Sequence, residues 1–351
     1  MLNAALEQFA VPHQVFYALK ANRHPELLAA LRASHACGID VCSPRELQRA
    51  LDAGFDESEI TYTGTAISPA DWEVICACPG IAINCDSLSS VRQLGERNPG
   101  REIGLRINPQ LTASHLEKVS YAGEKASKFG IYPDRFDEAL SLADRFRLRV
   151  TALHVHSGSG YLNPELKDFG RILDRLGEFV ARAPSVTTVD IGGGLGVPLR
   201  PGEQPLDLIA WAEMLSSFIK PLKLNLQVEP GDFLVKDAGI LLLEVCAVEE
   251  KGGTEFVYVN GGFNLSNLYA YYGYPNIVIP LRKDAGQALR PVTVAGNINE
   301  GIDLLGEDVL LPPLKEGDVL AFLNVGGYSA SSSSDHCMRG DFQEVVLAGA
   351  S

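Results

Sequence analysis

Hydrophobic residues recur along the first two-thirds of the chain in short runs that alternate with amphipathic segments. The segments carry helix signals, such as Pro25 near the start of one and Gly38 at its end. A doubly wound sheet uses fewer strands in this length, and no strand here leads into GxGxxG. We therefore predict a (β/α)8 barrel. Its buried strands are expected at residues 15–19, 39–43, 59–63, 81–85, 102–108, 150–157, 187–193 and 224–230.

The pattern changes after about residue 236. Strand-like runs now follow one another, broken by Gly, Pro, Asn and Asp, with no long helix between them. This pattern predicts a separate all-β domain of barrel or sandwich type. The runs lie at residues 240–251, 255–263, 276–282, 290–297, 318–328 and 342–349. We expect an α/β barrel domain over residues 1–236 and a β domain over residues 237–351.

Composition narrows the class of protein. The 351 residues include 30 Lys and Arg and 44 Asp and Glu, for a net charge of −14. An acidic chain lacks the basic surplus that a nucleic-acid partner requires, and no run reaches the ~18 apolar residues of a membrane span. The N-terminus shows no secretory signal, and seven cysteines suggest buried free thiols in the cytoplasm. Cys76 and Cys78 form an isolated CxC, so we expect no metal site.

Polar residues gather where the predicted strands end, which is where a (β/α)8 barrel carries its chemistry. Considered singly, these residues have simpler explanations. A lysine at a strand end can extend its amine to water, and a glycine triplet can form a tight turn. His154 and His156 alternate along one strand, so one should pack and the other should face the interior. The residues at these ends are Lys20, Asp40, Arg106, His154, His156, Gly192, Gly193, Gly194 and Glu229.

Together these residues meet the needs of one cofactor. A lysine amine forms an imine with an aldehyde, and glycines before a helix expose the backbone N–H groups that bind phosphate. A carboxylate keeps a pyridine nitrogen protonated, so that the ring accepts electrons. Lys20, Gly192–Gly194 and Glu229 therefore predict pyridoxal 5′-phosphate (PLP), with His156 stacked on its ring.

At these residues the sequence resembles the fold-type III PLP-dependent decarboxylases, the group of diaminopimelate and ornithine decarboxylases. The matching motifs span nearly the whole chain in the family's order. They are FYALKAN (16–22), DVCSPREL (40–47), LRINP (105–109), SKFGI (127–131), HVHSGSG (154–160), DIGGGLG (190–196), VEPG (228–231), GNINEGID (296–303) and GGYSASSSSDH (326–336).

The resemblance implies a decarboxylase of amino-acid or polyamine metabolism that removes CO2 from an amino acid, free or linked to a carrier protein. It implies catalytic roles for Lys20, His156 and Glu229. Further cofactor contacts are implied for Asp40, Arg106, Ser159, Gly192, Gly193, Gly194, Gly231 and Tyr328. The family completes its site across a homodimer interface with the segment 296–303, so we expect substrate contacts from Asn299, Glu300, Asp303 and Tyr272.

Four departures bear on the substrate. Asp232 replaces the arginine of EPGR, and Asn299 replaces the family's acidic cysteine, which an amide cannot match as a proton donor. Leu268 stands where diaminopimelate enzymes carry an arginine for the distal carboxylate. Relatives also have a longer N-terminal arm ahead of the residues that match Tyr17. We therefore expect a substrate other than diaminopimelate, and we consider Cys337 as the replacement donor, with Lys20, water, His336 and Glu300 left open.

Three alternative functions remain open at this point. Diaminopimelate decarboxylation is the first. The second is racemisation of the alanine-racemase type, which Glu229 disfavours because those enzymes place an arginine at the pyridine nitrogen. The third is a non-catalytic homologue that regulates a related decarboxylase by mixed dimerisation, which the retained Lys20, His156, Glu229 and Tyr328 disfavour.

Overall fold

The computed structural model describes residues 1–347 except 115–116, 124, 157, 201 and 283–287. Contacts divide the chain into two compact units. The first consists of Met1–Gly196 with Gln204–Phe233, and the second of Val197–Glu203 with Leu234–Ser351. Among the helices of the described residues, none has the length and hydropathy of a membrane span.

Eight parallel strands close the first unit into a barrel, because β1 pairs with β2 on one side and with β8 on the other. The predicted barrel is confirmed, and several strands end a few residues earlier than expected. The strands are β1 (His13–Ala18), β2 (Gly38–Val41), β3 (Ile60–Gly64), β4 (Ala82–Cys85), β5 (Glu102–Arg106), β6 (Arg149–His154), β7 (Thr188–Asp190) and β8 (Asn225–Val228).

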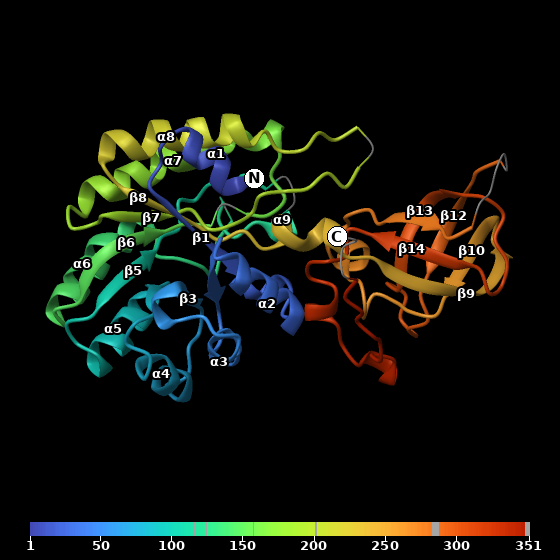
Figure 1. Ribbon diagram of the computed structural model, residues 1–351, viewed down its shortest axis with the longest axis horizontal. Helices are drawn as coiled ribbons and strands as arrows, with labels where there is room; N and C mark the ends of the chain where they lie inside the picture. The colour runs from blue at the N-terminus through green and yellow to red at the C-terminus, as the bar shows by residue number, and fades with distance from the viewer. Residues whose placement is uncertain (115–116, 124, 157, 201, 283–287, 348–351) are drawn as a thin grey trace. The chain divides into compact units, whose positions relative to one another are not determined.

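Helices surround this barrel (Figure 1). Two of them begin at a serine cap followed by proline: Ser43 and Ser68 each accept a hydrogen bond from the third helical N–H. The helix α1, which the sequence pattern did not predict, packs against α8. The helices of this unit are α1 (Leu2–Gln8), α2 (Pro25–Ser34), α3 (Pro44–Asp52), α4 (Pro69–Cys76), α5 (Leu88–Arg97), α6 (Phe136–Arg145), α7 (Leu166–Arg182) and α8 (Leu208–Leu222), and the short α9 (Asp232–Val235) begins in this unit and ends in the second.

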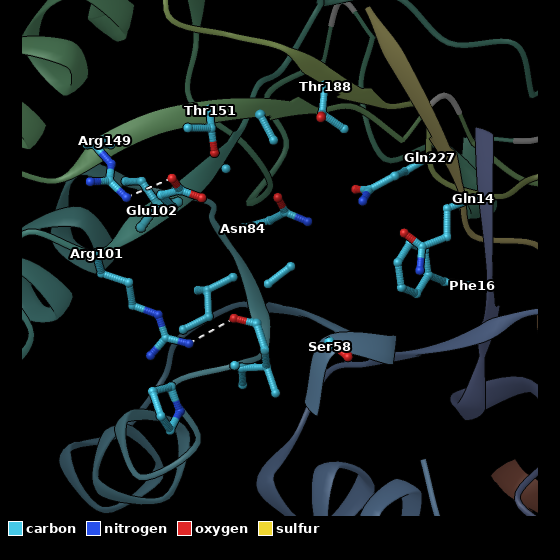
Figure 2. A pocket seen from close by; sticks show the side chains of 18 of the residues that line it. Gln14, Phe16, Ser58, Asn84, Arg101, Glu102, Arg149, Thr151, Thr188 and Gln227 are labelled. Carbon is cyan, nitrogen blue, oxygen red and sulfur yellow. Dashed lines mark hydrogen bonds and ion pairs between the residues drawn. The ribbon is translucent and has the colours of Figure 1, made fainter. Parts of the chain in front are cut away.

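The barrel interior is hollow near the amino ends of its strands. A cavity of about 510 Å³ lies there, lined by residues that include Gln14, Asn84, Gly104, Thr188 and Gln227 (Figure 2). These small or polar side chains stand where branched aliphatic residues usually fill such a barrel. The candidate catalytic residues lie at the opposite, carboxyl ends of the strands, so this cavity is separate from the predicted cofactor site.

The second unit is built on one six-stranded mixed sheet in the order β11-β14-β9-β10-β12-β13, which confirms the all-β prediction. The pair β10 and β12 is parallel, and the other pairs are antiparallel. Its core includes Val257, Val294 and Phe322. The strands are β9 (Leu241–Lys251), β10 (Thr254–Val259), β11 (Ile277–Pro280), β12 (Arg290–Ala295), β13 (Leu304–Leu311) and β14 (Val319–Leu323).

Two strand assignments in this unit were wrong. Residues 342–347 form no strand and are exposed, and residues 348–349 lie outside the described residues. The strand β13 was not predicted, because Gly306, Glu307 and Asp308 interrupt its apolar run. Its pairing with β12 is irregular at this point, and Asp308 has a φ of 53°. A bulge of this kind breaks the alternation on which strand prediction depends.

The cysteines are all free thiols, as expected for a chain without a disulfide framework. The expectation that they are buried was wrong for most of them. Cys85 is buried in β4, whereas Cys42, Cys246 and Cys337 are exposed.

Candidate active site

The candidate residues of the first unit gather at one rim of the barrel, because the parallel strands all end there. Lys20 lies in the short 3-10 turn (Leu19–Ala21) that follows β1. Asp40 lies in β2, Arg106 ends β5, and Glu229 follows β8. His154 and Asp190 are the last residues of β6 and β7. The structure therefore brings together side chains that are up to about two hundred residues apart in sequence.

Lys20 and Asp40 form an ion pair with 2.7 Å between Nζ and Oδ2. The Asp40 side chain is 1% exposed and the Lys20 side chain is 38% exposed, so the ammonium remains accessible at the rim. Burial and the neighbouring Glu229 carboxylate raise the pKa of Asp40 to about 7, although Lys20 opposes the shift. Lys20 is thus an accessible amine held by a buried acid.

Glu229 is a buried carboxylate held by a histidine. His154 Nε2 lies 3.0 Å from Glu229 Oε2. Burial lowers the pKa of His154, so its ring is neutral and, from this contact, donates its Nε2–H. Burial alone would raise the pKa of Glu229, but the hydrogen bond from His154 and the nearby Lys20 ammonium outweigh it and lower the pKa. Glu229 is therefore ionised, and its Oε1 is buried with no hydrogen-bond partner among the described residues.

The glycine turn after β7 is built for close backbone approach. Gly192 has a φ of 66° and Gly194 a φ of 92°, a region that favours glycine. A Cβ at Gly193 would lie 2.3 Å from the Glu229 carbonyl oxygen, and one at Gly194 would lie 2.1 Å from the Gly158 carbonyl oxygen. The turn therefore fits against both the end of β8 and the loop after β6 only without side chains.

His156 lies in that loop, two residues beyond β6. Its Nδ1 accepts a hydrogen bond from the Gly158 N–H at 3.3 Å, and its ring meets Tyr121 edge-on at 4.6 Å. Burial, reinforced by Arg106 and Lys20, lowers the pKa of His156 well below its ordinary value. The ring is therefore a neutral, fixed aromatic surface. Arg106 itself stacks on Phe129, with 4.5 Å from its guanidinium carbon to the ring centroid.

Comparison with known proteins identifies the family. Residues 1–236 match the model of the pyridoxal-dependent decarboxylase, pyridoxal binding domain. The diaminopimelate decarboxylase of Methanothermobacter thermautotrophicus is 35% identical over 348 residues, which is 95% of this chain and 80% of that protein. The chain belongs to the fold-type III PLP-dependent decarboxylases.

Two solved structures show the same architecture as this decarboxylase. Diaminopimelate decarboxylase from Helicobacter pylori complexed with L-lysine matches with a TM-score of 0.85 and 25% identity, over 96% of this chain and 87% of that one. Arginine decarboxylase of Paramecium bursaria Chlorella virus, bound to agmatine, shares the fold with a TM-score of 0.83 at 20% identity, over 97% and 91% of the two chains.

PLP is the cofactor of this decarboxylase family, and the residues of the rim fit it. The unpartnered Oε1 of Glu229 is an acceptor for a pyridine N–H. The backbone N–H groups of the glycine turn would bind the phosphate. Lys20 would hold the aldehyde carbon, and His156 would cover the ring. The contacts expected from Asp40, Arg106, Ser159, Gly231 and Tyr328 stay predictions.

The candidates of the second unit form a group of their own. The two Asp303 oxygens accept the backbone N–H groups of Phe263 and Ile298 at 2.7 and 2.6 Å. This buried carboxylate thus holds two loops together, and a substrate contact stays a prediction. Glu300 Oε1 lies 3.2 Å from His336 Nε2, and both side chains are exposed.

The remaining candidates of this unit lie on neighbouring loops. Cys337 is exposed in the short turn His336–Met338, and Asn299 is exposed beside Glu300. Tyr272 ends a helical turn over Leu268–Tyr272. Tyr328 has a φ of 57°, an uncommon backbone conformation for an aromatic residue that often marks a functional position. Their predicted contacts with cofactor and substrate stay predictions.

Sequence reasoning found the rim but gave no role to two of its buried residues, His154 and Asp190. Both are the last residues of their strands, and both are at most 1% exposed. The strand-end signal placed His154 at the rim, but a position at a strand end does not show which side chain is its partner.

Proposed function

We propose that this PLP-dependent amino-acid decarboxylase releases CO2 from the α-carbon of its substrate at the barrel rim. The pairing of His154 with Glu229 carries the proposal, because an ionised buried carboxylate suits decarboxylation rather than racemisation. When bound, PLP draws electrons from the substrate's α-carbon into its ring. Glu229 supports this by keeping a proton on the pyridine nitrogen, and His154 supports it by keeping Glu229 ionised.

The other rim residues have separate tasks. Lys20 offers its amine to the aldehyde, and Asp40 orients that amine through the 2.7 Å ion pair. His156 is neutral and fixed by Gly158, so it covers the ring without adding a charge. The backbone N–H groups of Gly193 and Gly194 would bind the phosphate, because the Gly192 N–H is donated to Asp190 Oδ1.

The test of this function is CO2 release by wild type and by Glu229→Gln. The amide cannot act as the ionised acceptor, so turnover should fall by about two to four orders of magnitude while PLP stays bound. The matched control is Glu178→Gln on the outer face of α7, where the side chain is 63% exposed. Near-normal turnover of Glu229→Gln would remove the central support for the proposal.

Two substrate candidates are supported by different observations. Diaminopimelate is favoured by the curated relatives, which carry that name at 30–35% identity, and the comparisons give no support for excluding it. An amino acid without a distal carboxylate is favoured by Leu268, which is buried and apolar at the position where the resemblance implies an arginine. An apolar side chain cannot pair with a carboxylate, so it would leave that charge unmatched.

A substrate panel separates the two candidates. CO2 release from diaminopimelate should be compared with release from lysine, ornithine, arginine, glutamate and carrier-linked amino acids. Leu268→Arg is the informative variant, because it restores the implied cation. A large gain on diaminopimelate in Leu268→Arg, with low activity in wild type, would favour the second candidate. High wild-type activity on diaminopimelate would establish the first.

We also propose that the enzyme acts as a homodimer. Lys20 belongs to the first unit, whereas Tyr328 and Glu300 belong to the second. The resemblance implies that residues of these two kinds meet across a two-fold interface. A dimer would then be required for activity, which mixing of differently inactivated subunits can test.

A further inference from the structure

A cluster of three titratable residues lies beneath the barrel rim. One ligand-type atom from each of His154, Asp190 and Glu229 lies within 4.8 Å of the others, and the three side chains are 1%, 0% and 4% exposed. The histidine is neutral, so the cluster holds two carboxyl groups without a cation of its own. Two ionised carboxylates this close in a buried place repel each other strongly, so one of them retains a proton.

The contacts of the two carboxyl groups indicate where that proton resides. Glu229 has the N–H of His154 at 3.0 Å, which stabilises its charge. Among the described residues, the Asp190 side chain accepts a hydrogen bond only from the backbone N–H of Gly192, 2.8 Å from its Oδ1. Its Oδ2 is buried with no hydrogen-bond partner among the described residues. Burial and the charge of Glu229 both raise the pKa of Asp190 well above its ordinary value.

Asp190 is linked through Gly192 to both the glycine turn and Glu229. Its Oδ1 holds the Gly192 N–H, and the Gly192 carbonyl in turn accepts the backbone N–H of Glu229 at 2.8 Å. Gly192 is thereby fixed between the side chain of one acid and the main chain of the other. Any displacement at Asp190 would be transmitted to both the glycine turn and Glu229.

We propose that Asp190 is a positioning residue that acts as a neutral carboxylic acid, holding the phosphate-binding turn through Oδ1 and directing the proton on Oδ2 toward Glu229. This role rests on the proposed placement of PLP at the rim. It leaves the negative charge of the cluster on Glu229 alone. Asp190 touches no substrate and takes no part in the reaction itself.

The test compares Asp190→Asn with Asp190→Ala. The asparagine amide reproduces a neutral acid, because its oxygen accepts the Gly192 N–H and its NH2 group donates toward Glu229. The PLP dissociation constant of Asp190→Asn, measured by fluorescence titration without substrate, should stay within about threefold of wild type. Asp190→Ala loses both contacts, and the dissociation constant should rise about tenfold to a hundredfold. Asp174→Asn, on the exposed face of α7, is the control.

Three results would overturn the role. An Asp190→Asn variant that loses as much PLP affinity as Asp190→Ala would show that the carboxylate charge is needed. An Asp190→Ala variant with wild-type affinity would show that Asp190 positions nothing. A visible spectrum of bound PLP that changes in Asp190→Asn would show that Glu229 had been disturbed.

Two further measurements keep the test decisive. Thermal unfolding of the PLP-free proteins separates poor folding of Asp190→Ala from weak PLP binding, and the Asp190→Asn result stands without it. Failure of the wild type to bind PLP would instead contradict the proposed placement of the cofactor. This failure is distinguishable from failure of the Asp190 role, because it would be seen in the unsubstituted protein.

Discussion

Replacement of Gly194 by alanine would separate the two segments that are predicted to bind the PLP phosphate. Gly194 has a φ of 92°, and a Cβ there would lie 2.1 Å from the Gly158 carbonyl oxygen, immediately before Ser159. Alanine at positive φ costs about 1 kcal/mol. Moving a packed backbone segment adds about 1–3 kcal/mol. The free energy of unfolding should therefore fall by roughly 2–4 kcal/mol.

The same displacement should weaken PLP binding. The Gly194 carbonyl accepts the N–H groups of Gly160 and Tyr161, so the turn cannot move without moving that loop. Loss of one hydrogen bond to the phosphate costs about 1.5–3 kcal/mol, which raises the dissociation constant roughly 10- to 100-fold.

A matched variant separates the effect of the close contact with Gly158 from the effect of the positive φ. Gly100 has a similar φ of 83°, but a Cβ there would meet no atom within 4 Å. Gly100→Ala should therefore lose only about 1 kcal/mol of stability and should bind PLP normally. Both variants are measured by chemical denaturation and by PLP fluorescence titration. Equal effects in the two variants would refute the reasoning, because the contact with Gly158 would then contribute nothing.

Four other outcomes follow from the site. Borohydride reduction of the PLP-loaded protein should leave a pyridoxyl group on Lys20 in peptide mass spectra, and an adduct on a different lysine would contradict the assignment. Mixed Lys20→Ala and Glu300→Ala subunits should recover about a quarter of wild-type activity per site if the homodimer shares its sites; no recovery despite subunit exchange would argue against sharing. The pKa of Asp40 is raised to about 7 in the folded protein, so its contribution to the stability of the PLP-free protein is full below about pH 4 and is lost as pH rises toward 7. The free energy of unfolding, measured by denaturation, should fall by roughly 2–4 kcal/mol over this range, and Asp40→Asn should remove that pH dependence. If Cys337 donates the final proton, Cys337→Ala should slow turnover and accumulate pyridoxamine phosphate, and an unchanged rate without that product would exclude it.

The barrel was predictable because its signals are local. Strands buried on both faces read as continuous apolar runs, and the helices between them begin at cap residues such as Ser43 and Ser68. The irregular strand β13 was not predictable in this way. Its residues 304–311 pair with β12 through a bulge, and only the partner strand determines where the bulge falls.

The candidate site likewise has residues with a local sequence signal and residues without one. Lys20 and Glu229 could be predicted as site residues because each has a chemical task that follows from its residue type at a strand end. The partner of Glu229 was not identified, because His154 lies 75 positions away along the chain and becomes a neighbour only when the barrel closes. The protonation of Asp190 is a property of distances across the barrel, and no local pattern encodes those distances.

The three buried acids of this rim differ in their hydrogen-bond partners, and this difference explains why Glu229 is ionised. Burial alone would raise the pKa of Asp40, Asp190 and Glu229 alike. The His154 N–H and the Lys20 ammonium reverse that shift for Glu229, whereas the Asp190 side chain, among the described residues, accepts a hydrogen bond only from a backbone N–H. Because like charges within a few ångströms cannot all persist in a buried site, the proton on Asp190 makes the charge on Glu229 sustainable. The acid that faces the predicted pyridine nitrogen is ionised because its neighbour is not.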